Sequence, residues 1–256
     1  MKVYMKNVLA YRGEFALSIF FSVLAEFVYM FVWIAVYAFS GITSLYGIPL
    51  SSMIVYFFVL GGLNFMAWPI IADTLEDGIR GGGIATFLIR PFKYSYALFA
   101  SILPYNLLSM ALGAMPILIA VYIIFGLHTG AVALLAFAAE VVLAFAIINM
   151  IGFIVGALSV YITDIYGIMQ GFYVIFLLLG GGLMPLTLYP KLAYAILMLT
   201  PFPYLYYIPA GIFTGIITVG ALPSIFAIGV AWFAVLAVLG ELMWRRVSRA
   251  LNAVGV

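Results

Sequence analysis

The chain has 256 residues, of which 68% are hydrophobic and 7% are charged, and its mean hydropathy is +1.31. So few polar side chains cannot cover a soluble globule of this length, and the composition therefore predicts a protein whose surface is covered mainly by lipid. The formal net charge of +2 does not indicate nucleic-acid binding, and the lack of cysteine excludes disulfides, thiol catalysis and thiolate metal sites.

Basic residues gather in three short clusters, which are separated by long apolar runs. Nine of the ten Lys and Arg residues belong to these clusters: Lys2, Lys6 and Arg12; Arg80, Arg90 and Lys93; and Arg245, Arg246 and Arg249. Cytoplasmic segments of membrane proteins carry an excess of Lys and Arg. We therefore expect a multi-pass protein of the plasma membrane with both termini in the cytoplasm, its basic residues meeting anionic lipid headgroups.

Six apolar runs are long enough to cross a bilayer as helices, which takes about 20 residues. They cover residues 15–39, 51–72, 96–125, 131–161, 167–188 and 219–244. The third run is longer than a bilayer requires, and Pro104 and Pro116 predict a kink in it. With no soluble domain or linker between the runs, residues 1–256 are expected to form one all-α transmembrane domain.

The apolar segment at residues 189–218 is the exception among these runs. It contains four prolines, Pro190, Pro201, Pro203 and Pro209. Each proline removes a helix donor, so a continuous seventh span is not expected. The segment instead predicts a re-entrant or interfacial hairpin of two short pieces. At the other end of the protein, residues 1–12 alternate basic and apolar residues close to helical spacing, which predicts an interfacial helix on the inner leaflet, with a frayed tail as the alternative.

Polar residues inside the predicted spans are the candidates for function. An ionised carboxylate near the bilayer centre is costly, so Glu26 and Glu140 should be protonated, paired or turned toward a polar cavity. Glu26 is a candidate for a substrate pathway, with a structural bond as the alternative, whereas Glu140 is favoured as structural. The amides are weaker candidates because they often link helices: Gln170 is assigned to the pathway and Asn149 to structure, beside Asn64 and Asn106.

Catalytic and cofactor sites are not indicated by the sequence. The only histidine, His128, has no acidic cluster or cysteine near it, so we expect no metal site and no catalytic triad. No Gly-Lys pair occurs, which excludes a phosphate-binding loop of the usual pattern. If ATP is used, another chain must bind it.

Two glycine motifs and one polar segment are further features of the sequence that predict contacts. Gly152 with Gly156 and Gly167 with Gly171 form G-x-x-x-G motifs, which let helices approach closely. Residues 73–95 begin DTLEDGIRGGGIATFLIRPFK, with acidic residues, a glycine turn and an Arg-Pro end. This pattern predicts a cytoplasmic loop with a short amphipathic helix after the glycines that docks a soluble partner, and an ordinary solvated loop is the alternative.

The stretch IRGGGIATFLIRP at residues 79–91 resembles the cytoplasmic loop of permease subunits of ABC-type-2 exporters. The stretch at residues 180–215 is similar to the outer hairpin of the same family, including its prolines Pro185, Pro190, Pro201 and Pro209. With the basic start and end, the resemblance covers nearly the whole chain. It departs at residues 77–79, where an extra glycine leaves the register of Glu76 and Asp77 open.

The resemblance implies a six-span permease that pairs with a second copy or a paralogous permease and binds a separate ATPase subunit in the cytoplasm. It implies that four residues couple the permease to that subunit: Glu76, Asp77, Arg80 and Arg90. It also implies that the first and fifth helices line a path for a small amphiphilic substrate, which Glu26 contacts.

A proton-coupled secondary transporter or channel, with Glu26 and Glu140 as a relay, is the alternative function. The sequence lacks an inverted repeat and has a loop suited to docking, and both features disfavour this alternative. An intramembrane enzyme is disfavoured because no nucleophile and base lie close together.

Overall fold

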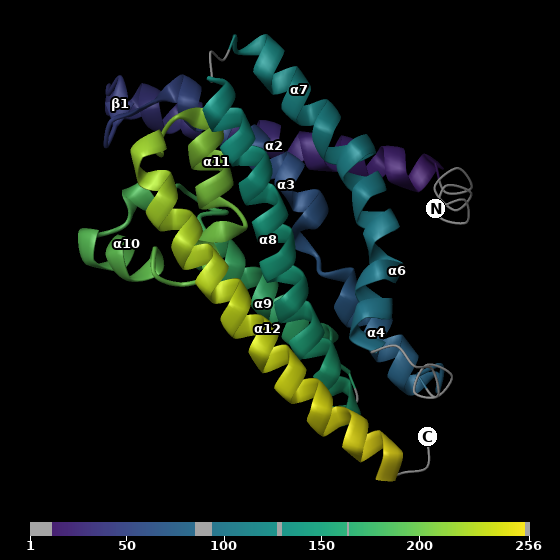
Figure 1. Ribbon diagram of the computed structural model, residues 1–256. Coiled ribbons are helices and arrows are strands. Elements are labelled where there is room, and N and C mark those ends of the chain that lie inside the picture. Colours follow the sequence, from purple (N-terminus) through teal and green to yellow (C-terminus); the bar gives the residue numbers. More distant parts are fainter. Residues whose placement is uncertain (1–11, 85–93, 127–129, 163, 254–256) are drawn as a thin grey trace.

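The computed structural model describes residues 12–84, 94–126, 130–162 and 164–253, most of which are helical (Figure 1). The longer helices are α2 (Arg12–Ser40), α3 (Leu50–Ala67), α4 (Ile70–Arg80), α6 (Tyr94–Ser109), α7 (Met115–Ile124), α8 (Ala131–Ala157), α9 (Tyr166–Leu179), α10 (Lys191–Leu197), α11 (Tyr207–Thr214) and α12 (Leu222–Ala253). Short helical turns lie at Met110–Ala114, Leu158–Val160, Leu186–Leu188, Phe202–Tyr204 and Val219–Ala221.

Within the described residues, five helical stretches are long and apolar enough to cross a membrane. They are Phe20–Ser40, Leu50–Arg80, Tyr94–Ile124, Ala131–Val160 and Val219–Arg249. These stretches confirm an all-α membrane protein. The predicted fifth span differs: α9 has 14 residues and ends at Leu179 rather than at residue 188. A helix of that length covers roughly 21 Å, less than the ~30 Å of bilayer hydrocarbon.

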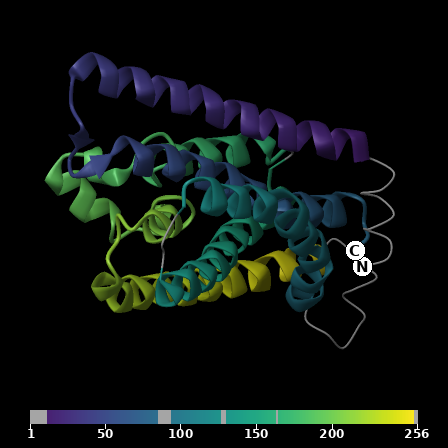
Figure 2. The same cartoon turned by 90° about the horizontal axis from the view of Figure 1, so that it is seen from above.

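The helices run between two ends of the molecule. The start of α2 and the ends of α4 and α12 lie at one end, whereas α10 and a small β-hairpin lie at the other (Figure 2). The hairpin pairs β1 (Ser44–Leu45) with β2 (Ile48–Pro49) across a turn in which Tyr46 and Gly47 have positive φ. This two-residue turn is the type that suits the twist of paired strands, and it leads the chain from α2 into α3.

Two helices form the centre of the packing. Helix α3 is apolar on all sides and largely buried, with Tyr56, Phe57 and Met66 almost fully enclosed. Helix α8 packs against α4, α11 and α12. Helix α2 lies along the outside of the bundle against α3, and α12 lies along the opposite side (Figure 2).

The segment at residues 73–95 differs from the predicted loop. Its first part is helical, because α4 begins at Ile70 and continues to Arg80. The predicted second span therefore does not stop at residue 72: α3 ends at Trp68–Pro69, where proline disfavours helix in the residue before it, and α4 follows at once. The buried residues Ile71, Ala72 and Leu75 give α4 an apolar face. The amphipathic helix predicted after the glycines falls on residues 85–93, outside the described residues.

The predicted third span is interrupted, as its prolines suggested. Helix α6 contains Pro104 and passes into the π-helical turn Met110–Ala114, after which α7 begins with Pro116 in its first turn. Figure 1 shows the change of direction between α6 and α7. The turn packs tightly on α3, because a Cβ at Gly113 would lie 2.5 Å from the Phe65 ring.

The two G-x-x-x-G motifs have different surroundings. A Cβ at Gly152 would lie 2.5 Å from Pro69, and one at Gly156 would lie 2.9 Å from Ala72 Cα, so this pair brings α8 against the backbone of α4. At Gly167 and Gly171 on α9, an added Cβ would meet no atom within 4 Å. Only the first pair is a packing contact within the described chain.

This difference gives a matched stability test. Gly156→Ala places a methyl group against the backbone of α4, which cannot shift without displacing the helix. Overpacking of this kind costs about 1–3 kcal/mol. Gly171→Ala meets open space and improves helix propensity by about 1 kcal/mol. We expect the melting midpoint of the monomer isolated in detergent, followed by tryptophan fluorescence, to fall for Gly156→Ala and to hold or rise for Gly171→Ala. Equal midpoints would contradict the α4–α8 contact.

Candidate functional site

Glu26 lies on α2, where its side chain is almost completely buried against α3. Glu26 is 3% exposed, and a Cβ added at Gly61 would lie 2.7 Å from Glu26 Cγ. Gly61 therefore provides the space that the glutamate occupies. Atom Oε2 of Glu26 has no hydrogen-bond partner in the described chain. A buried carboxyl in this position favours a polar or cationic partner over apolar surroundings.

Hydroxyl and amide groups from three other segments lie beside Glu26. Tyr206, which precedes α11, donates its hydroxyl to Asn64 Oδ1 on α3 at 2.8 Å. Tyr173 on α9 lies near both Tyr206 and Glu26. Together with Tyr29 on α2, these residues form a polar cluster, called here the Glu26 cluster, in which Glu26 and Tyr206 are buried and the other three are half-buried.

The proline-rich segment before α11 determines where Tyr206 lies. Tyr207, which follows Tyr206, donates its backbone N–H to Gly180 O at 2.9 Å. This bond attaches the segment to the end of α9. Tyr204 donates its hydroxyl to Ile225 O of α12 at 2.7 Å. Tyr204, Tyr206 and Tyr207 are each 1% exposed or less. Helix α11 thus lies in the interior and α10 on the surface, and the re-entrant hairpin stays a prediction.

The other residues assigned from the sequence lie apart from this cluster. Gln170 donates to the hydroxyl of Tyr166, one turn earlier on α9, at 2.7 Å. Glu140 on α8 is fully buried near Tyr204, and neither of its oxygens has a hydrogen-bond partner in the described chain. Asn149 donates to Phe145 O on its own helix at 2.9 Å, so its N–H bond does not link two helices.

Three of the four predicted coupling residues lie at the end of α4. Arg80 and Glu76 form an ion pair of 2.8 Å across one helical turn, and the Arg80 side chain is 42% exposed. Asp77 is exposed between them. The fourth residue, Arg90, lies outside the described residues. The end of α4 therefore presents both signs of charge on a helix whose other face is buried.

A glycine turn closes α4. Gly81 donates to Asp77 O at 2.8 Å, Gly82 has a φ of +70, and Ile84 donates to Gly78 O at 3.0 Å. The left-handed conformation at Gly82 favours glycine. Ile84 is fully buried, so the turn is fixed at both ends while Gly81, Gly82 and Gly83 are exposed.

Comparison with known proteins identifies the family. A family model described as ABC-2 family transporter protein matches residues 23–255. The chain belongs to this family. It is a transmembrane permease of an ABC transporter, and a permease of this kind is the membrane component of a transport system. No curated protein and no solved structure matches the chain.

Sequence reasoning identified Glu26 and Asn64 but missed Tyr29, Tyr173 and Tyr206. These tyrosines are unremarkable in a chain with 18 of them, and Tyr206 is 142 residues from Asn64. The dense group of tyrosines at residues 204–207, next to three prolines, was the available sign. A buried tyrosine needs a partner for its hydroxyl, so such a group within an apolar hairpin predicts polar contacts.

The Glu26 cluster can be tested by removing one hydroxyl. Tyr206→Phe removes the donor of the half-buried Asn64 Oδ1, and loss of a hydrogen bond of this kind costs about 0.5–1.5 kcal/mol. Tyr166→Phe is the matched control, because that hydroxyl is hydrogen-bonded to Gln170 at an exposed position. We expect a clear drop in melting midpoint for Tyr206→Phe and almost none for Tyr166→Phe. If both variants melt like the wild type, the Tyr206–Asn64 bond contributes nothing to stability.

Proposed function

We propose that this permease is the membrane subunit of an ATP-driven exporter, in which residues 1–256 form one transmembrane domain coupled to a separate ATPase chain. The observation that carries the proposal is the end of α4, where charged residues and a fixed glycine turn are exposed on a helix that packs tightly on α8. A soluble subunit bound there can move α4 without unfolding it. The ATPase supplies the energy, and the permease itself catalyses no chemical step.

The packing supports a route from α4 to the interior. Gly152 and Gly156 bring α8 into backbone contact with α4, so a displacement of α4 also displaces α8. Helix α8 also packs against α11, and the segment before α11 carries Tyr206 of the Glu26 cluster. In this proposal, nucleotide binding by the partner shifts the population between an inward-open and an outward-open arrangement through this chain of contacts.

The Glu26 cluster is the proposed polar contact for substrate. It lies where α2, α3 and α9 meet the hairpin, and the surrounding interior is rich in aromatic and methionine side chains. An amphiphile with a polar or cationic group matches such surroundings, with its apolar part against the aromatic rings. Gln170 on α9 belongs to the same pathway in this proposal, whereas Glu140 and Asn149 serve structure.

A second permease, identical or paralogous, completes the pathway. Helix α9 is too short to cross the hydrocarbon by itself, and its Gly167 and Gly171 face open space. Close helix packing through small residues is a common way for membrane helices to associate. The membrane is proposed to be the plasma membrane, with both termini and α4 in the cytoplasm. The ends of α4 and α12, with Arg80, Arg245 and Arg246, lie at one end of the molecule, and α10 with Lys191 lies at the other.

Substitutions at the end of α4 test the coupling role. Glu76→Gln and Arg80→Gln remove the ion pair, and a swapped variant carrying both Glu76→Arg and Arg80→Glu rebuilds it in reverse. We expect all three variants to lower transport and transport-coupled ATPase activity of the complex about tenfold, because binding of the ATPase depends on the sign of the charge at each position. Co-purification of the ATPase and transport into proteoliposomes are the measurements.

Arg249→Gln, an exposed arginine on α12, is the matched control and should behave like the wild type. Recovery of coupling in the swapped variant would mean that the ion pair only stabilises α4, since reversing an i, i+4 pair changes helix stability by a few tenths of a kcal/mol. Normal transport in every variant would remove the coupling role.

The role of Glu26 in transport can be tested with one substitution that removes only its charge and a second that also removes its hydrogen bonding. Glu26→Gln keeps the size and hydrogen bonding of the side chain but removes its capacity for charge, whereas Glu26→Leu removes both. We expect Glu26→Gln to reduce transport of a cationic amphiphile about tenfold while expression and assembly with the ATPase stay normal. Glu140→Gln, another buried glutamate, should leave transport unchanged. Normal transport by Glu26→Gln with unfolding of Glu26→Leu would assign Glu26 to structure.

A further inference from the structure

Aromatic rings from several segments border the carboxyl of Glu26. On α2, Tyr29 and Trp33 follow Glu26 at spacings of three and seven residues, which places all three on one face of the helix. The rings of Tyr29 and Trp33 both stack on Phe57 of α3, with centroid separations of 5.0 and 5.9 Å. Tyr206 adds a further ring near the carboxyl. The surroundings of Glu26 are thus more aromatic than polar.

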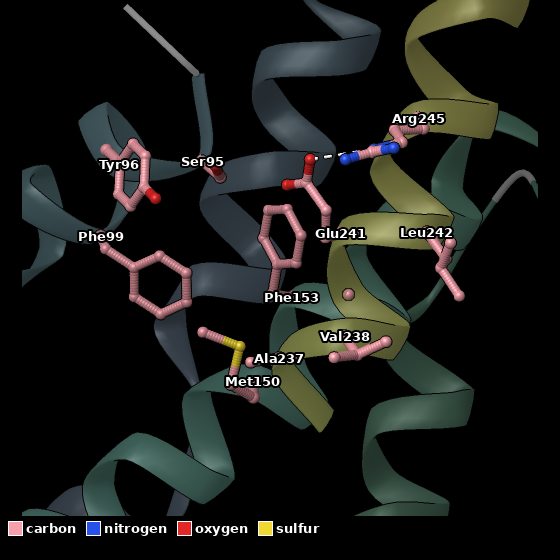
Figure 3. A pocket seen from close by; sticks show the side chains of 11 residues that line it. Ser95, Tyr96, Phe99, Met150, Phe153, Ala237, Val238, Glu241, Leu242 and Arg245 are labelled. Carbon is pink, nitrogen blue, oxygen red and sulfur yellow. Dashed lines mark hydrogen bonds and ion pairs between the residues drawn. The ribbon is translucent and has the colours of Figure 1, made fainter. Parts of the chain in front are cut away.

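The carboxyl of Glu26 has no basic partner among the described residues. Its Oε2 atom accepts no hydrogen bond there, and the ion pairs of the described chain do not include it. Glu241 provides the contrast. It lines a separate groove between α6, α8 and α12, where its carboxylate pairs with Arg245 at 3.1 Å (Figure 3). A cationic guest therefore finds a free counter-charge at Glu26, whereas at Glu241 it would compete with an arginine.

An apolar groove between α2, α3 and α7 adjoins the Glu26 cluster. Its volume is about 410 Å³, and all of its lining side chains are apolar. Val23 and Met30 line the groove and lie one helical turn from Glu26 on either side. Phe27, the next residue after Glu26, also lines it and meets the ring of Phe58 edge to face at 5.4 Å. One guest can therefore place a charged group at Glu26 and an alkyl chain in the groove.

We propose that the Glu26 cluster and this groove bind a quaternary ammonium amphiphile with a single alkyl chain. The trimethylammonium group lies against the Glu26 carboxylate and the ring of Tyr29, and the alkyl chain follows the groove along α7. The groove volume is within the range of about 300–1,000 Å³ that is typical of small-molecule sites. This inference rests on the proposed role of the cluster in substrate contact and names the chemical class of the substrate.

The supply of hydrogen-bond acceptors favours a quaternary over a primary ammonium. A primary ammonium has three N–H donors, and each needs an acceptor once it is buried. Asn64 Oδ1 is already bonded to Tyr206 at 2.8 Å. A trimethylammonium has no N–H donor, and it avoids the strong hydration of a compact ammonium. Its charge is attracted to the faces of aromatic rings, an interaction by which proteins recognise quaternary ammonium groups.

Two cations with the same alkyl chain test the proposal. The full chain is reconstituted in lipid nanodiscs and titrated with octyltrimethylammonium or octylammonium in a calorimeter, and the heat from empty nanodiscs is subtracted. Both probes carry one positive charge near neutral pH. We expect the wild type to bind the trimethyl probe about tenfold more tightly. Tyr29→Leu should remove this preference, whereas Tyr29→Phe keeps the ring and should retain it.

Further variants test the charge and the groove separately. Glu26→Gln should weaken binding of both probes about tenfold, and Glu241→Gln, in the other groove, should bind like the wild type. Ala120→Trp fills the groove along α7 and should weaken binding of both octyl probes. Ile119→Trp is the matched control, because Ile119 is 53% exposed on the same helix and does not line the groove.

Three results would each overturn the proposal: octylammonium binding to the wild type at least as tightly, an unchanged preference in Tyr29→Leu, or equal binding by Ala120→Trp and Ile119→Trp. Octylammonium binding that depends on Glu26 would leave the cluster as a substrate contact, whereas binding of neither probe would remove that role too. If Ala120→Trp fails to fold, as judged by its melting profile, the comparison of Tyr29→Leu with Tyr29→Phe decides.

Discussion

A peptide group buried in a lipid-covered protein cannot bond to water, so every break in a helix needs a partner from the protein itself. This chain meets that requirement largely with tyrosine. Tyr56 donates to Gly181 O at 2.7 Å and Tyr189 donates to Leu178 O at 2.6 Å, where α9 ends early. Tyr204 bonds to Ile225 O in the same way. A segment with four prolines can therefore lie inside the bundle, where a loop without such donors would be too costly.

The position of the proline-rich segment before α11 determines the contacts around Glu26. Because the segment before α11 is bonded to α9 and α12, Tyr206 is held between α3 and α9, where it meets Asn64 and Tyr173. Gly61 leaves space for Glu26 beside them. Helix α11, which follows this segment, packs on α8, which also supports α4. The exposed end of α4 and the Glu26 cluster are thus connected through α8 and α11, an arrangement suited to transmitting a movement.

Features governed by local chemistry could be predicted from the sequence. Apolar runs located the five stretches of the described residues that are long enough to span a membrane, prolines located the interruption of the third span, and both glutamates were recognised as unusual. Contacts between distant segments could not be predicted. Residues 73–80 contain three acids and look like a loop, but Ile71, Ala72 and Leu75 bury one face against neighbouring helices and extend the structure to Arg80. Likewise, α9 ends at Leu179 because Gly180, Gly181 and Gly182 allow a turn that hydrogen bonds from Tyr56 and Tyr207 hold.

The two buried glutamates illustrate why residue type alone does not assign a role. Glu26 has hydroxyl and amide groups from three other segments beside it, so a polar guest that displaces one of them still finds donors and acceptors. Glu140 lies on the central helix beside Tyr204, whose hydroxyl is already committed to Ile225 O. A guest at Glu140 would compete for a hydroxyl that bonds to the backbone of α12, whereas a guest at Glu26 would meet a bond between two side chains, Tyr206 and Asn64. The cost of opening each site, rather than its charge, therefore favours Glu26 as the residue that meets substrate.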